Sequence, residues 1–286
     1  MTMKTILVPL EESEAVTSIL TTAWLAATRF GSLIEGLYIR RALPGVVVAD
    51  IGGYAAATPD LMQSFEEEDW RRDKRVRSIF ESFMGDKGVP LDAGPAGESP
   101  TAAWTEIAEP GDIAVGMYAR VFDLTVVGRP IAGASAPAMS TLETILFDSG
   151  RPILIAPPKA PASLAETVVV SWNRSTETAR TLAAAMPFLA QAGRVVVLAV
   201  EGVSVPGPST ADAARYLKRN GIAAEAREIS SDGRGGGEAI LAEAANLGAD
   251  LLIKGAYTHS RLRQLIFGGA TSHILSQAEL PVFMAH

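Results

Sequence analysis

The sequence predicts an α/β protein built from two similar halves, each with a five-stranded parallel sheet. Short apolar runs alternate with segments of helical spacing along the 286 residues, which is typical of right-handed β-α-β crossovers. Segments of the first half also resemble segments of the second. A proline-rich run at 156–163 separates the halves and reads as a short, stiff linker. We therefore predict domains at 1–158 and 164–286.

An internal repeat supports the two-domain organisation. The matching pairs are TILVPLEES (5–13) with TVVVSWNRS (167–175), FDLTVVG (122–128) with ADLLIKG (249–255), and RPILIAP (151–157) with LPVFMAH (280–286). Each pair is a predicted strand at the same place in its half.

The first half contains an insertion and a long charged helix. Its predicted strands are 5–9, 33–39, 91–97, 124–127 and 153–156, and its predicted helices are 15–30, 65–84, 113–120 and 141–147. Ser13 is the expected N-cap of the first helix, and Ser140 and Thr141 are expected to cap the last. Helix 65–84 places opposite charges within i, i+4 reach on a solvent-exposed face. The 41–62 insertion is a flap, a disordered segment or a contact with another chain, and its valines and Tyr54 favour a contact.

The second half has a more regular pattern. Its predicted strands are 168–171, 194–200, 222–229, 251–253 and 282–284, and its predicted helices are 176–191, 211–220, 237–247 and 271–277. The glycine run 233–237 precedes a helix but lacks the Lys-Ser/Thr of a P-loop, so we expect a flexible βα loop. Ligands of such sheets bind beyond the carboxyl ends of the strands. That rule places residues 171–173 beside the loop that begins at Gly255.

The loop between Gly255 and Thr271 is the main candidate for a site. Small residues at 268–270 would let backbone N–H groups approach an anion at a helix N-terminus. Arg261 and Arg263 are candidate phosphate partners, and His259 lies beside them. The alternative is a crossover whose glycines only turn the chain.

Composition excludes several classes of protein. The chain has no cysteine, which excludes disulfides, thiol catalysis and thiolate metal sites. The net charge of −7 lies in the first half, with 14 basic and 21 acidic residues through position 160 against 11 of each afterwards. Without a basic tract, nucleic-acid binding is not expected.

No apolar run approaches the roughly 18 residues of a membrane span. The N-terminal run reads as a strand rather than a secretion signal, so we expect a cytoplasmic protein. We find no spacing for a metal site or a catalytic triad.

These repeats and this loop resemble the universal stress protein (UspA-type) family, in a tandem two-domain form. The family loop has Gly, two residues, Gly, nine residues, Gly, then Ser or Thr. Gly255 and Gly268 match it, whereas Thr258 and Gly269 replace the second glycine and the hydroxyl residue, with Thr271 supplying a hydroxyl two residues later. The resemblance implies an adenine-nucleotide alpha-hydrolase-like (Rossmann-like) fold. It also implies pairing of the two last strands, here an intramolecular pseudo-dimer, and it leaves room for a homodimer.

The same resemblance implies an ATP site in the second half. Ser171 and Trp172 would flank the base, Asn173 would contact a ribose hydroxyl, and Val200 would meet the adenine. The residues implied for the phosphates are Gly255, Tyr257, Thr258, Gly268, Gly269, Ala270 and Thr271. Trp172 would either stack on the base or fill the pocket, and no residue is implied as a metal ligand.

The first half looks like a nucleotide-free copy, because Gly128 is followed by no Gly-Gly or Gly-Ser before its helix. Three hypotheses follow for the whole chain. The first is a stress-response protein that binds ATP without efficient turnover. The others are a nucleotide-independent interaction protein and a slow ATPase.

Overall fold

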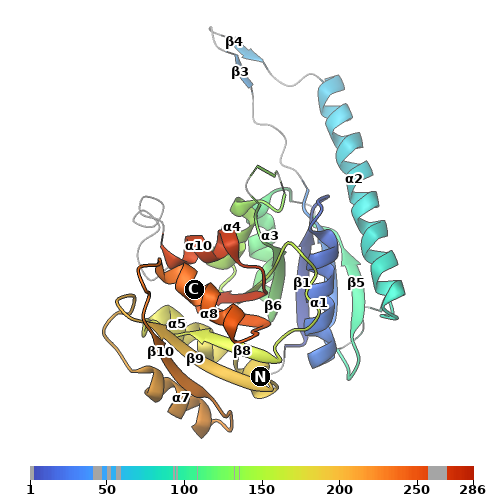
Figure 1. The fold of residues 1–286 in the computed structure, drawn as a ribbon. Helices are drawn as coiled ribbons and strands as arrows, with labels where there is room; N and C mark the ends of the chain where they lie inside the picture. The colour runs from blue at the N-terminus through green and yellow to red at the C-terminus, as the bar shows by residue number, and fades with distance from the viewer. Residues whose placement is uncertain are drawn as a thin grey trace.

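The computed structural model describes residues 3–40, 47–49, 53–55, 59–92, 94, 96–107, 109–131, 133–134, 136–256 and 269–286. The fold is α/β, as predicted, and its centre is a ten-stranded sheet covered by helices on both faces (Figure 1). Among the described residues, no helix combines the length and hydropathy that a membrane span requires.

Each half contributes five strands to the sheet. Those of the first half are β1 (Thr5–Leu10), β2 (Leu33–Tyr38), β5 (Thr101–Thr105), β6 (Leu124–Gly128) and β7 (Ile153–Ala156). Those of the second are β8 (Thr167–Ser171), β9 (Arg194–Val200), β10 (Glu225–Ile229), β11 (Leu251–Gly255) and β12 (Val282–Ala285). The strand order is β10-β9-β8-β11-β12-β7-β6-β1-β2-β5.

The two halves join through their last strands. Within the ten-stranded sheet, the strands of each half pair in parallel, whereas β12 and β7 are antiparallel, with Phe283 opposite Leu154. The order of equivalent strands is the same when read outward from this contact in either direction. The predicted pseudo-dimer within one chain is therefore confirmed, because pairing β7 with β12 removes an edge strand from each half.

Helices form one layer on each face of the sheet. The helices are α1 (Val16–Phe30), α2 (Pro59–Asp86), α3 (Asp112–Tyr118), α4 (Met139–Asp148), α5 (Thr176–Ala184), α6 (Met186–Ala190), α7 (Thr210–Arg219), α8 (Gly236–Asn246) and α10 (Ala270–Gln277), with a 3₁₀ turn η1 at Ala119–Val121. One buried apolar cluster contains side chains of α1, α2, α5, α6 and α7. The other contains side chains of α3, α4, α8 and α10.

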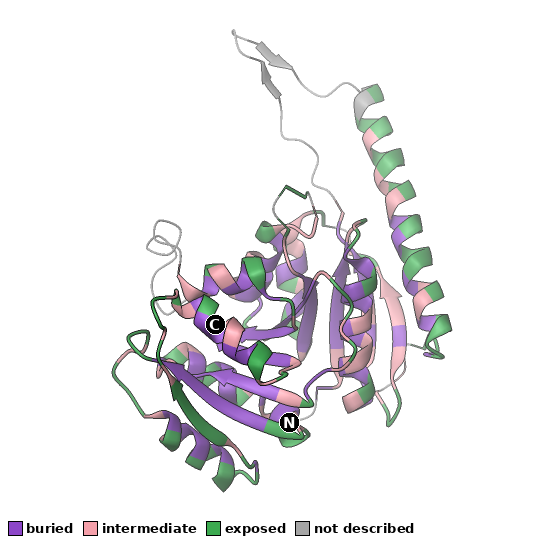
Figure 2. Ribbon diagram, in the orientation of Figure 1, coloured by how far each residue is buried: buried purple, intermediate pink, exposed green. Residues whose placement is uncertain are grey.

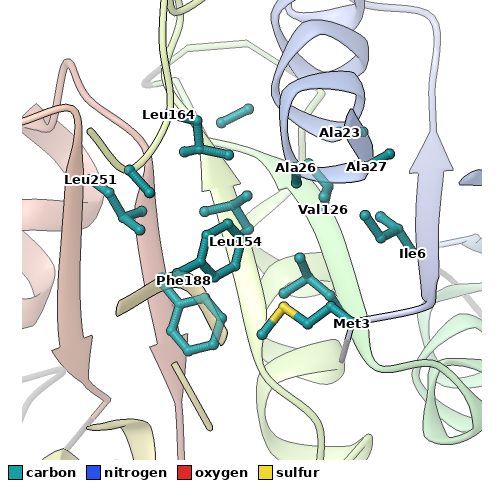
Figure 3. Packing of buried hydrophobic residues seen from close by; sticks show 14 of the residues in the cluster. Met3, Ile6, Ala23, Ala26, Ala27, Val126, Leu154, Leu164, Phe188 and Leu251 are labelled. Atoms are coloured by element: carbon teal, nitrogen blue, oxygen red, sulfur yellow. The ribbon is translucent and has the colours of Figure 1, made fainter. Parts of the chain in front are cut away.

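Both clusters run across the junction of the halves. In the first, Leu154 of β7 lies together with Phe188 and Leu251 of the second half (Figure 3). The Phe188 ring centroid is 4.9 Å from that of Phe30 and 5.8 Å from that of Phe283, both in edge-to-face geometry. The halves therefore share one core on this face.

The long helix α2 stands beside β5 and extends past the sheet (Figure 1). Its predicted self-paired face is confirmed by i, i+4 ion pairs of Arg71 with Glu67, Arg72 with Glu68, and Arg77 with Glu81. Most of this helix is exposed, as is edge strand β10, whereas the central strands are buried (Figure 2). Within the 41–62 insertion, β3 (Val47–Ala49) and β4 (Gly53–Ala55) form an antiparallel hairpin, and α2 begins at Pro59. The remaining insertion residues lie outside the described part.

Two predicted elements were wrong. The third strand of the first half is β5, not 91–97, where Leu91 makes only an isolated bridge to Ala102. The sequence of β5, TAAWT, carries little apolar signal because it lies at the edge of the sheet. The single helix predicted at 176–191 is broken at Ala185, because Pro187 has no N–H for an interior hydrogen bond and suits a helix start.

The predicted caps in the first half were also wrong. Ala15 occupies the N-cap of α1, and no side chain caps that helix, whereas Ser13 provides only a carbonyl to Val16 N–H. Ala138 is the N-cap of α4, and the Thr141 hydroxyl instead donates to Asp112 Oδ1 at 2.6 Å. In the second half, Ser175 Oγ caps α5 by accepting from Thr178 N–H.

Candidate functional site

A cavity of about 320 Å³ lies beyond the carboxyl ends of β8 and β11, against the N-terminus of α10. β8 is flanked by β9 and β11, so the strand order reverses direction beside it. That switch point is where ligands of doubly wound sheets bind. The lining residues are Ser171, Asn173, Gly202, Val203, Val205, Ile240, Lys254, Gly269, Ala270 and Thr271.

The strands determine which side chains reach the cavity. Ser171 and Lys254 are paired in register on β8 and β11. Their predecessors two residues back, Val169 and Leu252, pack in the cluster on the α8 and α10 side of the sheet. Side chains alternate along a strand, so Ser171 and Lys254 face that same side. The prediction that residues 171–173 lie beside the start of the Gly255 loop is confirmed.

Trp172 faces the other way. Its ring belongs to the cluster on the α1 and α5 face, it is 7% exposed, and its indole Nε1–H donates to the Pro208 carbonyl at 2.9 Å. It does not line the cavity. The structure therefore corrects the expectation that Trp172 flanks a base, because its one donor and its ring are already used in the core.

Asn173 connects the end of β8 to the start of α5. Its side-chain oxygen accepts from Ser175 N–H at 3.2 Å and from the Thr178 hydroxyl. The backbone carbonyl of Asn173 accepts from Val205 N–H at 3.1 Å, which holds the loop after β9 over the cavity. Asn173 lines the cavity, and its contact with a ribose hydroxyl stays a prediction.

The apolar wall comes from residues that the sequence analysis did not identify. The residues that form this wall are Val203, Val205 and Ile240. Val200, at the end of β9, is buried, and its backbone carbonyl accepts a hydrogen bond from Val203 N–H in the turn that follows. Val200, which was expected to meet an adenine, therefore does not line the cavity. A sequence signal existed in the alternation of valine with small residues at 203–207.

Lys254 is the main residue that sequence reasoning missed. It is 7% exposed, and its Nζ donates to the Gly255 carbonyl at 3.0 Å. Burial lowers the pKa of Lys254 from 10.5 to about 8, and no charged neighbour contributes to that shift among the described residues. A lone lysine inside the apolar run LLIKG was the available signal, because an unpaired charge is rarely buried in a strand.

The N-terminus of helix α10 lies at the cavity. It begins at Ala270, its N-cap is Gly269, and no side chain caps it. The first N–H groups of a helix have no partner within the helix, and they carry the positive end of its dipole. Gly269, Ala270 and Thr271 all line the cavity, and their contact with a phosphate stays a prediction. Tyr257, Thr258 and Gly268 lie outside the described residues, together with His259, Arg261 and Arg263.

Several glycines near the site serve packing. A Cβ on Gly255 would come within 2.6 Å of the Thr178 backbone nitrogen. A Cβ on Gly237 would come within 2.7 Å of the Ala270 carbonyl oxygen, and one on Gly236 within 2.8 Å of Val203. Gly236 and Gly237 belong to α8, so the predicted flexible loop is shorter than the run 233–237.

The equivalent place in the first half is nearly filled. Its cavity measures about 20 Å³, room for one water. Pro137 occupies the space, since a Cβ on Gly128 would lie 2.4 Å from Pro137 Cγ. Glu11 and Val127 line it at the positions that Asn173 and Lys254 hold in the second half. This described cavity is far smaller than the roughly 300–1,000 Å³ typical of ligand pockets.

With this geometry established, comparison with known proteins identifies the second half. The sequence profile of the universal stress protein family matches residues 166–286. Residues 166–286 form a universal stress protein domain. No curated protein matches the sequence significantly.

Solved structures extend the likeness to the whole chain. A universal stress protein from Archaeoglobus fulgidus DSM 4304 is 17% identical, and the alignment covers 100% of this chain and 99% of that chain with a TM-score of 0.67. A functionally unknown protein from Pseudomonas aeruginosa PAO1 is 14% identical over 99% of this chain and 92% of that chain, with a TM-score of 0.52. At these identities the likeness concerns the fold, which both halves share with universal stress proteins.

Proposed function

We propose that the second half of this chain binds an adenine nucleotide, ATP, and holds it without efficient turnover as part of a stress response. The observation that carries the proposal is the cavity at the β8–β11 switch point, lined by the N-terminus of α10. Its volume of about 320 Å³ lies within the roughly 300–1,000 Å³ range typical of ligand pockets. Its walls combine apolar side chains with a few converging polar groups.

The lining also favours binding over turnover. Of the lining residues the structure describes, none is a carboxylate or a histidine, the groups that most often activate water. Lys254 is the titratable group among them. A protonated amine is a phosphate partner rather than a base.

The test is to identify and quantify the ligand released from freshly purified protein by mass spectrometry, followed by titration calorimetry of the stripped protein with ATP. Ala270→Glu places a carboxylate where an anion would bind, while an acid in the first turn suits the helix dipole. We expect ATP or ADP near one per chain in the wild type, and affinity lost on the order of 30-fold in Ala270→Glu, which corresponds to about 2 kcal/mol. Ser272→Glu, on the exposed side of the same turn, is the matched control.

A nucleotide-independent interaction protein is the second candidate. It is favoured by Gly255, whose small size is explained by the approach of α5 alone. Absence of nucleotide, together with no heat at millimolar ATP, would overturn ATP binding in favour of this candidate. Phosphate release by the wild type above the Ala270→Glu background would indicate an ATPase. Homodimerisation through the insertion and a cytoplasmic location stay predictions.

A further inference from the structure

Lys254 is a buried cation for which the described protein supplies no counter-charge. Among the described residues, its Nζ donates to the neutral Gly255 carbonyl at 3.0 Å and forms no ion pair, and no charged neighbour contributes to its pKa shift. Leaving a buried ammonium uncompensated costs free energy, because the charge has lost its water shell. Lys254 also lines the cavity, so a ligand can reach it.

The internal repeat shows that the fold does not need this lysine. Val127 of β6 holds the position in the first half that Lys254 holds on β11, one residue before the final glycine of each strand. Val127 is 4% exposed, and its side chain is part of the buried apolar cluster on the α8 and α10 face of the sheet. An apolar residue therefore satisfies the strand, and the lysine must be explained by what lies in the cavity.

A second exchange at the cavity has the same direction. Glu11 lines the small cavity of the first half, and the amide Asn173 holds its place in the second. The second cavity thus has a cation where the first has an apolar residue, and a neutral amide where the first has an acid. The N-terminus of α10 adds partial positive charge to the same space.

We propose that Lys254 is the residue that makes this cavity select phosphorylated ligands, its ammonium binding the phosphate together with the N-terminal N–H groups of α10. This deepens the proposed nucleotide function and assigns a specificity-determining role to a residue outside the Gly255–Thr271 loop. A charge-assisted hydrogen bond in a partly dry site strengthens binding of the charged ligand only. The uncharged part of the ligand contacts the apolar wall of Val203, Val205 and Ile240 instead.

The experiment compares three probes on stripped protein by calorimetry: ATP, adenosine and pyrophosphate. The variant is Lys254→Met, which has the apolar character found at Val127, and the control is Lys218→Met, an exposed lysine on α7. We expect Lys254→Met to weaken ATP and pyrophosphate on the order of 30-fold, the size of one charge-assisted contact. The affinity for adenosine should stay within about twofold of wild type. A general loss of structure would instead weaken the binding of adenosine as well.

The outcomes separate the two proposals. If the wild type binds ATP and Lys254→Met binds it equally well, the role of Lys254 is overturned and the nucleotide function stands. Another outcome is that the wild type binds pyrophosphate through Lys254 with an affinity equal to or higher than its affinity for ATP. In that case the role of Lys254 stands, and the proposal that the ligand is an adenine nucleotide is overturned. If the wild type binds none of the three probes, both are overturned.

Discussion

The carbonyl end of β11 lies against the first turn of α5, where a Cβ on Gly255 would stand 2.6 Å from the backbone nitrogen of Thr178. The neighbouring atoms are backbone, so they cannot rotate away. Thr178 is itself fixed, because its N–H donates to Ser175 Oγ and its hydroxyl donates to the Asn173 side chain. Gly255 therefore sets the distance between the sheet and the helix that positions Asn173 at the cavity.

Gly255→Ala should consequently destabilise the protein by about 1–3 kcal/mol, the usual cost of an extra methyl in a packed region. Urea unfolding followed by circular dichroism measures it. Gly85→Ala on α2 is the control, since a Cβ there meets nothing within 4 Å, and alanine favours a helix over glycine by up to about 1 kcal/mol. Equal stability of wild type and Gly255→Ala would show that α5 moves freely.

Phe188 should couple the two halves. Its ring is fully buried and contacts Phe30 of the first half and Phe283 of the second. Phe188→Ala should cost about 3–5 kcal/mol and lower the unfolding midpoint of both halves. Trp172 reports on the second half and Trp24 on the first, so single-tryptophan variants follow each half by fluorescence. The exposed Ile113→Ala is the control. Separate midpoints for the two reporters would contradict a shared core.

The fold could be predicted because its signal is repeated. The matching runs of β1 and β8, and of β6 and β11, mark the same strands twice, and the observed strand order repeats in the two halves. Thr101–Thr105 escaped prediction because an edge strand buries little and so needs few apolar residues. The break at Ala185 was missed because apolar spacing continues through it, although Pro187 marks a helix start.

The position of the cavity at the carboxyl ends of the strands was predicted, whereas several of its lining residues were not. Ser171 and Asn173 line the cavity at the end of β8, as the position of that strand predicts, whereas the loop motif does not include Lys254. Period-two alternation would have placed Trp172 on the opposite face from Ser171. Val203 and Val205 reach the cavity through a hydrogen bond from Val205 to Asn173, a long-range contact that local patterns do not encode.

Stability should depend on pH through Lys254. Its pKa is about 8 in the folded protein against 10.5 ordinarily. Between these values the unfolded chain binds more protons, so the free energy of unfolding rises with pH over that window. Below pH 8 the full cost is present, at most about 3 kcal/mol for a shift of this size. Lys254→Met should therefore be more stable than wild type at pH 7, with the advantage declining as the pH approaches 10.5.

Urea unfolding of both proteins at several pH values between 7 and 10.5 measures this difference. Lys218→Met provides the background for loss of a solvent-exposed lysine. Parallel stability curves for wild type and Lys254→Met would mean that Lys254 keeps its ordinary pKa. The buried cation would then be compensated after all.

ATP binding should not require a divalent cation. Mg²⁺ prefers carboxylate ligands, and the lining residues include none, while the described residues hold no cluster of His, Asp or Glu suited to a metal. Lys254 supplies the positive charge in its place. EDTA should therefore change the ATP affinity of the wild type by less than about threefold. A tenfold loss of affinity, about 1.4 kcal/mol of binding free energy, is the size expected if a metal ion were required.

Asn173→Asp provides the matched gain of function. An aspartate oxygen can accept the same bonds from Ser175 and Thr178, so the turn into α5 is retained. The new carboxylate would repel phosphate unless a cation bridges them. We expect weaker ATP binding in EDTA and recovery on adding Mg²⁺, by calorimetry in paired buffers. A wild-type affinity that falls tenfold or more in EDTA would show that a metal, rather than Lys254, balances the phosphate charge.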